Sequence, residues 1–285
     1  ASWPWLFAVN LPFGVLTFFL ARRYLPGNPT CVEGRRFDFS SAVLNALTFG
    51  LFIGCVEAFS HGLSFRWIVA GVVLLAGIGT VFVRRQLRQP YPMLPFDLLR
   101  IPVFSLSVLT SILSFTSQML GMVALPFMFH LTFGMNAAET GLLMTAWPLV
   151  IVVAGPLAGT LATKIHPGLL GGVGLLLMSV GCFLLASVGY GGLVARLMLC
   201  GFGFGLFQSP NNHLLLSSAP SYRTGGASGM QATARLVGQT TGAALVALLF
   251  YLNGDRAPHA AMWLAGGFTL CGSLVFCSRL RAHRF

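Results

Sequence analysis

The sequence predicts an all-α membrane protein of about nine transmembrane helices. Its residues are 56% hydrophobic and only 8% charged, whereas a soluble domain carries about 25% charged residues. A chain this apolar cannot cover its own surface with polar groups, so we expect the lipid bilayer to surround it. Its apolar runs are continuous and do not alternate with polar residues, which favours helices over a β-barrel.

The predicted spans are apolar stretches that approach the length of about 20 residues needed to cross a bilayer as a helix. The first and third are short, but Trp5 and Trp67 at their ends are of the type that settles at membrane interfaces. A Pro- and Arg-rich segment, residues 84–102, separates the first three spans from the last six. The spans cover residues 5–20, 40–60, 67–83, 103–131, 140–163, 169–188, 193–218, 227–252 and 260–278.

The basic residues predict the orientation of the chain. Thirteen of the 17 Lys and Arg residues fall in alternate loops, whereas the opposite loops hold only Arg66 and Arg256. By the positive-inside rule, Phe285 at the C-terminus is cytoplasmic and Ala1 lies outside. The same scattered distribution argues against nucleic acid as a partner, despite a net charge of +11.

The sequence contains no signature of an enzyme or of a metal site. We find no zinc-protease motif, no phosphate-binding P-loop and no nucleophile elbow. The six cysteines show no CxxC spacing and are interpreted as small core residues, not as disulfides or metal ligands. We therefore predict no enzymatic activity, no cofactor and no metal. Because the first residue is Ala1 and an apolar run begins within a few residues, without a charged segment before it, we expect a piece of a longer protein and not a signal peptide.

Arg235 is the strongest polar feature inside a predicted span. It lies about nine residues into that span, roughly 13 Å deep, which is too deep for easy snorkelling to the surface. Gln231 and Gln239 are four residues away on either side, so one face carries Gln, Arg and Gln. Two interpretations stay open: a substrate-path or gating residue, or a structural arginine bonded to carbonyls of a neighbouring helix.

A second polar group lies in the preceding span around Pro210, which should bend or break the helix. We interpret Gln208 and Asn211 as candidates to line a pathway, and Asn212 and His213 as partners in hydrogen bonds between helices.

Two further polar residues are candidates for the pathway. Glu57 is the one carboxylate clearly inside an apolar run and could carry a proton. Because it lies near the outer end of its span, a hydrated interfacial glutamate is the favoured interpretation. Gln118 could line a cavity or bond to a neighbouring helix.

Three Gly-xxx-Gly pairs are predicted to be sites of close helix packing, because small residues let backbones approach. They are Gly155 and Gly159, Gly201 and Gly205, and Gly238 and Gly242. Together with Pro156 and Pro210 they form the predicted packing and gating set.

Four stretches together carry a family resemblance. They are WPWLFAVNLPFG at residues 3–14, MLPFDLLR at 93–100, GPLAG at 155–159, and a glycine-rich signature over residues 201–210, 225–229 and 235–242. The chain resembles the fourteen-span drug:proton antiporters of the major facilitator superfamily, most closely the branch of methyl viologen and quaternary ammonium exporters. The resemblance covers essentially the whole chain.

The resemblance implies that the nine spans correspond to spans six to fourteen, with the N-terminal five missing. The implied division is the last helix of an N-terminal bundle (1–20), a cytoplasmic loop (21–39), an inserted helix pair (40–83), a cytoplasmic linker (84–102), a C-terminal six-helix bundle (103–278) and a cytoplasmic tail (279–285).

The implied function is proton-coupled efflux of multiple drugs or lipophilic cations by alternating access, in the bacterial inner (plasma) membrane. The implied partners are the bilayer, a small lipophilic or cationic substrate, protons and a missing N-terminal half that would hold the proton-coupling acid. The alternatives are a truncated or split fragment that does not transport without a partner half, and a major facilitator transporter of another small substrate.

Overall fold

The computed structural model describes residues 8, 10–24, 38–60, 64–89, 92, 94–187, 189 and 191–282. Every regular element among these residues is a helix. The chain divides into two compact units, Ala1–Asp38 and Phe39–Phe285. The first unit contains α2 (Asn10–Tyr24), which buries none of its residues. Trp3 and Trp5 lie outside the described residues.

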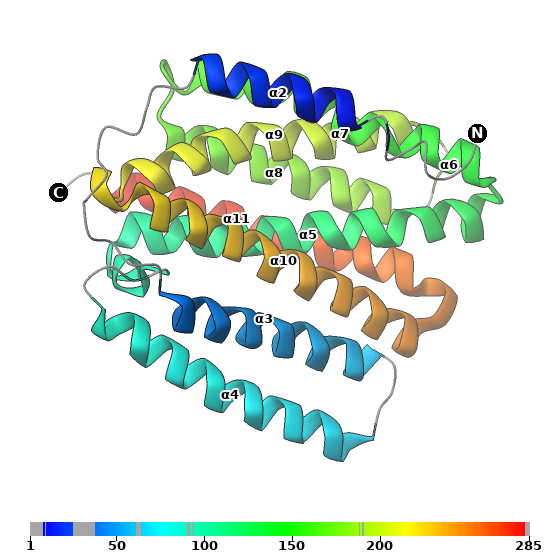
Figure 1. The fold of residues 1–285 in the computed structure, drawn as a ribbon. Helices are drawn as coiled ribbons and strands as arrows, with labels where there is room; N and C mark the ends of the chain where they lie inside the picture. Colours follow the sequence, from blue (N-terminus) through cyan, green and yellow to red (C-terminus); the bar gives the residue numbers. More distant parts are fainter. Residues whose placement is uncertain are drawn as a thin grey trace. The chain divides into compact units, whose positions relative to one another are not determined.

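The second unit consists of a helix pair and a larger bundle (Figure 1). In the pair, α3 (Phe39–Ser60) packs against α4 (Phe65–Arg88). The short helix η1 (Phe96–Arg100) then leads into the bundle, and α3 contacts the bundle at α10. The bundle helices are α5 (Pro102–Phe133), α6 (Ala137–Met144), α7 (Ala146–Leu161), α8 (Pro167–Ala186), α9 (Leu193–Ser217), α10 (Thr224–Asn253) and α11 (Ala257–Ala282), with the short turns η2 (Ser221–Arg223) and η3 (Gly254–Arg256) on either side of α10.

Seven segments of the described chain are long and apolar enough to cross a membrane. The last of them, Ser221–Ser278, contains both α10 and α11. The helix α2 is not among the seven and has 15 residues. The all-helical membrane fold is thus confirmed, whereas the count of nine spans and the division into domains stay predictions.

One predicted span differs from the structure in its continuity. The stretch predicted at 140–163 is two helices, α6 and α7, with the junction at Thr145. Pro148 lacks a backbone N–H and therefore cannot bond to the carbonyl of Met144. At the start of α6, Asn136 and Glu139 form a reciprocal capping box, with the Glu139 N–H donating to Asn136 Oδ1 at 2.9 Å.

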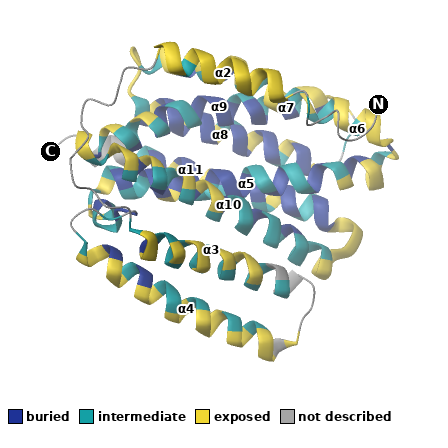
Figure 2. Ribbon diagram, in the orientation of Figure 1, coloured by how far each residue is buried: buried dark blue, intermediate teal, exposed yellow. Residues whose placement is uncertain are grey.

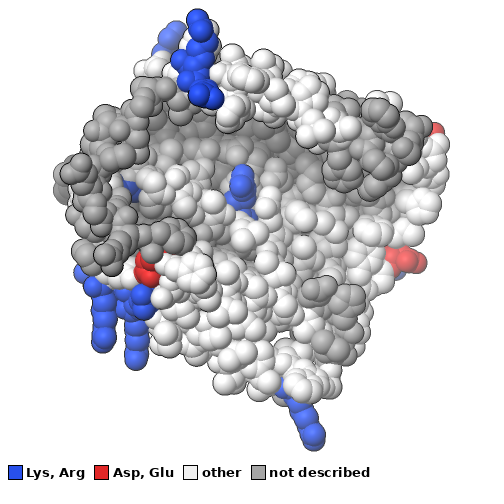
Figure 3. All heavy atoms as spheres, in the orientation of Figure 1, with Lys and Arg blue, Asp and Glu red and all other residues white. Residues whose placement is uncertain are grey.

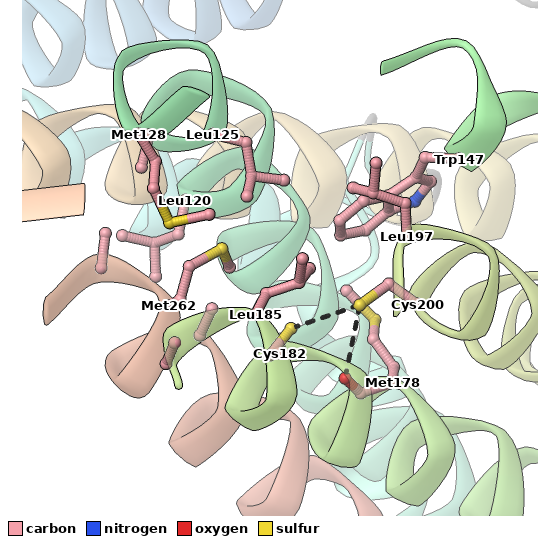
Figure 4. Packing of buried hydrophobic residues seen from close by; sticks show 14 of the residues in the cluster. Leu120, Leu125, Met128, Trp147, Met178, Cys182, Leu185, Leu197, Cys200 and Met262 are labelled. Atoms are coloured by element: carbon pink, nitrogen blue, oxygen red, sulfur yellow. Dashed lines mark hydrogen bonds between the residues drawn. The ribbon is translucent and has the colours of Figure 1, made fainter. Parts of the chain in front are cut away.

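The main core lies where α5, α7, α8, α9 and α11 meet (Figure 4). Its largest fully buried side chain is Trp147. Cys182 of α8 and Cys200 of α9 are both buried in this core, with their Sγ atoms 4.0 Å apart. Their predicted place in the core is confirmed, but Cys271 of α11 is exposed. Figure 2 shows the burial concentrated inside the bundle, while α3 and α4 carry large exposed stretches.

Candidate functional site

The helix α10 carries the predicted Gln–Arg–Gln stripe, and it is held tightly against α5. A Cβ added at Gly238 would lie 2.7 Å from the Ile112 carbonyl oxygen, and one at Gly242 would lie 2.6 Å from that of Thr116. Because no side chain larger than hydrogen fits there, the two backbones are in direct contact. This close approach is what a packing role for the glycine pair requires, and it fixes the stripe relative to α5.

Arg235 is exposed on α10. It is the twelfth residue of a 30-residue helix, about 17 Å along the axis at 1.5 Å per residue. Within the described part of the chain it makes no hydrogen bond and no ion pair, so no carbonyl of a described neighbouring helix holds it. The interpretation of Arg235 as a structural arginine bonded to a neighbouring helix therefore finds no support among the described residues.

Gln231 is half-buried and connects α10 to α9. Its Nε2 donates a hydrogen bond of 2.5 Å to Oδ1 of Asn212. The predicted hydrogen bond between helices is thus confirmed for Asn212. His213, the next residue, is exposed and has no partner among the described residues, so the same prediction for His213 is wrong.

Asn211 lies in the contact between α9 and α5 and is only 1% exposed. Its Nδ2 donates to Ser111 Oγ at 2.7 Å, and its Oδ1 accepts from Thr110 Oγ1 at 3.3 Å. Both ends of the amide are therefore used inside the helix contact. In this conformation Asn211 joins α5 to α9, and its paired amide avoids the cost of an unsatisfied polar group in the core.

The helix α9 also differs from its prediction at Pro210. It runs unbroken from Leu193 to Ser217 through this buried proline, so the predicted broken helix is not present. Gln208 and Gln118 are half-buried and have no hydrogen-bond partner among the described residues. Their predicted place along a pathway stays a prediction.

Gln239 lines a hollow between α10, α5 and α3. The hollow has a volume of about 360 Å³ and is otherwise mostly apolar. Glu57 belongs to α3, but its side chain lies outside the described part of the structure, so its predicted role is untested. The lining residues are Ile53, Val56, Met119, Gln239, Thr240, Ala243 and Ala244.

The two remaining glycine pairs behave differently from each other. A Cβ at Gly201 would lie 2.4 Å from the Trp147 carbonyl oxygen, and one at Gly205 would lie 2.6 Å from Ala154 Cβ, so α9 packs closely on α7 at this pair. Gly155 has no heavy atom within 4 Å of such a Cβ, and Gly159 has only Ser209 Oγ at 3.8 Å. A side chain added at either glycine would thus meet little, although the backbone nitrogen of Gly155 borders the close contact at Gly205, and the packing role of this pair stays a prediction.

Pro156 lies between these two glycines, inside α7, and is exposed. Its predicted gating role stays a prediction.

Sequence reasoning missed an ion pair that connects η1 to η2. The two terminal guanidinium nitrogens of Arg223, Nη1 and Nη2, donate to the Asp97 carboxylate, with 2.8 Å between Nη2 and Oδ1. The hydrogen bonds from Arg223 lower the pKa of Asp97. The two residues are 126 positions apart, so no local spacing could have indicated the pair. The described residues contain no group of three or more His, Cys, Asp or Glu side chains that could hold a metal ion.

Comparison with known proteins decides the family. The family model described as Major Facilitator Superfamily matches residues 1–243 and 106–284. The chain belongs to the major facilitator superfamily. It is therefore a multi-pass membrane protein of a transporter family, in agreement with its composition and helices.

Three curated relatives illustrate the range of this family. The chain is 49% identical over 288 residues to YebQ, an uncharacterized transporter of Escherichia coli K12, covering 100% of the chain and 63% of YebQ. It is 30% identical over 271 residues to the multidrug resistance protein Stp of Mycobacterium tuberculosis, covering 90% of the chain and 49% of Stp. It is 24% identical over 258 residues to the riboflavin transporter RibZ of Clostridioides difficile, covering 87% and 54%. The chain spans about half to two thirds of the length of these relatives.

Proposed function

We propose that the chain is the C-terminal part of a proton-coupled exporter of small lipophilic cations that works by alternating access. We place this transporter in the bacterial inner membrane, with the C-terminus of the chain in the cytoplasm. The family membership and the name of the multidrug resistance relative support export of drugs. The observation that carries the proposal is Arg235, an arginine without a described partner in the middle of a long apolar helix.

An exposed guanidinium at this depth constrains what can surround it. Charge in hydrocarbon costs at least about 3 kcal/mol, so Arg235 must face water or an acidic partner. We propose that it faces the aqueous pathway in one state of the cycle and a carboxylate of the rest of the transporter in the other. Closing the pathway around Arg235 then requires that partner to be charged, which would couple gating to protonation.

Arg235 itself repels a cation, so we assign substrate contacts to uncharged groups. Gln239 lies one turn away and borders a hollow whose remaining lining is largely apolar. Such a surface fits a flat, lipophilic cation better than a strongly hydrated one. The predicted pathway residues in this chain are thus Arg235, Gln231, Gln239, Gln208 and Gln118, with Glu57 and Asn211 as further candidates.

A second candidate function has one specific observation in its favour. The riboflavin transporter is also a relative, at 24% identity, so the substrate could be another small molecule. The split-fragment alternative predicts no transport by this chain in any setting without a second polypeptide. Members of the family are transporters, and we propose no enzymatic activity.

The test compares Arg235→Ala with Arg256→Ala in the whole transporter, expressed in cells that lack their own drug pumps. Arg256 is an exposed arginine of the turn η3 and serves as the matched control. We expect ethidium efflux by the parent and by Arg256→Ala, its loss after a protonophore is added, and at least a tenfold slower rate for Arg235→Ala at equal membrane abundance. Undiminished efflux by Arg235→Ala would refute the gating role. Transport of riboflavin but not ethidium would favour the second candidate.

A further inference from the structure

The end of the α3–α4 pair forms a basic hollow, separate from the stripe on α10. It has a volume of about 560 Å³. Its lining consists of Leu44 of α3 and, from the last turns of α4 and just beyond, Val81, Arg84, Arg85, Arg88 and Gln89. Three of these six residues are arginines and none is acidic. The lining of the hollow is therefore strongly basic.

The arginines are held in place by the way α4 is anchored. Phe82 and Gln86 alternate with them along the helix and are 2% and 1% exposed, and Gln86 Oε1 accepts a hydrogen bond of 3.1 Å from the Leu94 N–H. This contact fixes the rotation of α4 and turns Arg84 and Arg88 outward, where both are exposed. Arg85 Nε donates to Ser41 Oγ of α3 at 3.3 Å, which joins the two helices at the hollow.

Charge and apolar surface meet at this hollow. Figure 3 shows basic side chains gathered at this end of the molecule, with acidic atoms beside them. Asp97, in the linker that follows α4, is engaged with Arg223. Val81 is 56% exposed, and the exposed residues Leu74 and Val73 continue the apolar surface along α4. A ligand that fits must therefore combine an anionic head with an apolar tail.

We propose that this hollow binds the headgroup of an anionic phospholipid. Guanidinium groups bind phosphate oxygens through paired N–H donors, and basic pockets between transmembrane helices bind acidic headgroups. The arginines also offset the partial negative charge at the C-terminal end of α4. Soluble phosphate has the same phosphate chemistry as the headgroup. We assign the site to a lipid because Leu44 and Val81 add an apolar lining that an acyl chain can contact. The assignment does not depend on which membrane face the hollow occupies.

The test measures lipid binding to the purified full chain in neutral detergent by native mass spectrometry. Phosphatidylglycerol and phosphatidylcholine with identical acyl chains are titrated, and glycerol phosphate provides the soluble headgroup. The variant Arg84→Gln/Arg88→Gln is compared with Arg66→Gln/Arg256→Gln, which removes two exposed arginines outside the hollow. Val81→Trp fills the hollow and leaves its charges intact.

An arginine near an anionic surface contributes about fivefold in affinity, so two predict a loss of roughly 25-fold. We expect that loss for phosphatidylglycerol in Arg84→Gln/Arg88→Gln, a change under about twofold in the control pair, and no change for phosphatidylcholine. Val81→Trp should also weaken phosphatidylglycerol binding. Equal losses in the two double variants would overturn the site. Binding of glycerol phosphate as tight as that of the lipid would overturn the assignment to a phospholipid.

Discussion

Replacing Gly242 by alanine tests the contact that fixes α10 on α5. The added Cβ would lie 2.6 Å from the Thr116 carbonyl oxygen, 2.8 Å from Met119 Cβ and 3.3 Å from the Leu120 backbone nitrogen. Unstrained contacts of this kind need about 3.5 Å, so the helices must separate locally by roughly 1 Å. Two of the three atoms belong to the backbone and cannot rotate away.

The magnitude follows from two opposing effects. Overpacking a close contact costs about 1–3 kcal/mol, whereas alanine gains up to about 1 kcal/mol over glycine in helix propensity. We therefore expect Gly242→Ala to lower the free energy of unfolding by about 1–2 kcal/mol. Gly155→Ala is the matched control, since its Cβ would meet no heavy atom within 4 Å. That variant should be unchanged or more stable by up to about 1 kcal/mol.

The assay is unfolding by sodium dodecyl sulfate in mixed micelles, followed by tryptophan fluorescence. Trp147 is fully buried in the core and reports loss of the packed state. The reasoning fails if Gly242→Ala is as stable as the parent, or if Gly155→Ala loses as much as Gly242→Ala. Either result would mean that the described approach of the two helices does not limit the size of residue 242.

Two further predictions concern polar contacts. Asp97→Asn should reduce stability at neutral pH by about 1 kcal/mol, a value typical of a partly exposed pair, because Arg223 is 15% and Asp97 is 44% exposed. The pKa of Asp97 is lowered in the fold, so its contribution is fully present above the unfolded value near 4 and is lost as the pH falls through the lower folded value. As the pH is lowered from 7 to 3, the free energy of unfolding of the parent should therefore approach that of Asp97→Asn. A difference between the two proteins that stays constant with pH would contradict the ion-pair account. Asn211→Leu should lower the free energy of unfolding by about 1 kcal/mol in the same micelle assay, because its hydrogen bonds to α5 are lost. His213→Leu, at an exposed position two residues later, should change it by almost nothing. Equal effects of the two substitutions would argue against the hydrogen-bonded contact.

Helices were predictable from the sequence because apolar runs in lipid must satisfy their own backbone hydrogen bonds. The span predicted at 193–218 is α9, Leu193–Ser217. The helix α4 extends to Arg88, past the predicted end at residue 83, because arginines end an apolar run without ending a helix. Hydropathy marks where a helix can lie in lipid and does not mark where its hydrogen bonds stop.

Contacts between helices were only partly predictable. The pairs Gly201/Gly205 and Gly155/Gly159 have the same spacing, yet an added Cβ would clash with a neighbouring helix only at Gly201 and Gly205. Spacing places two glycines on one helix face but does not say whether another helix covers that face. The contact of Asn211 with α5 could not be predicted for the same reason, because its partners Ser111 and Thr110 lie in a helix about 100 positions away.

The proposed pathway residues depend on the glycine contact through helix geometry. At about 100° per residue, Arg235 and Gln239 lie roughly 60–100° around α10 from Gly238. They are therefore beside the surface that touches α5 and cannot turn without breaking that contact. If α10 rotated alone during transport, Gly238 and Gly242 would move away from the α5 backbone. The gap left between the two helices would contain no side chain to fill it. A rigid movement of α5 and α10 together avoids this cost and carries Arg235 from one environment to the other, so a disulfide engineered across the α5–α10 contact should leave transport intact. Transport abolished by that crosslink and restored by its reduction would show that α10 moves against α5.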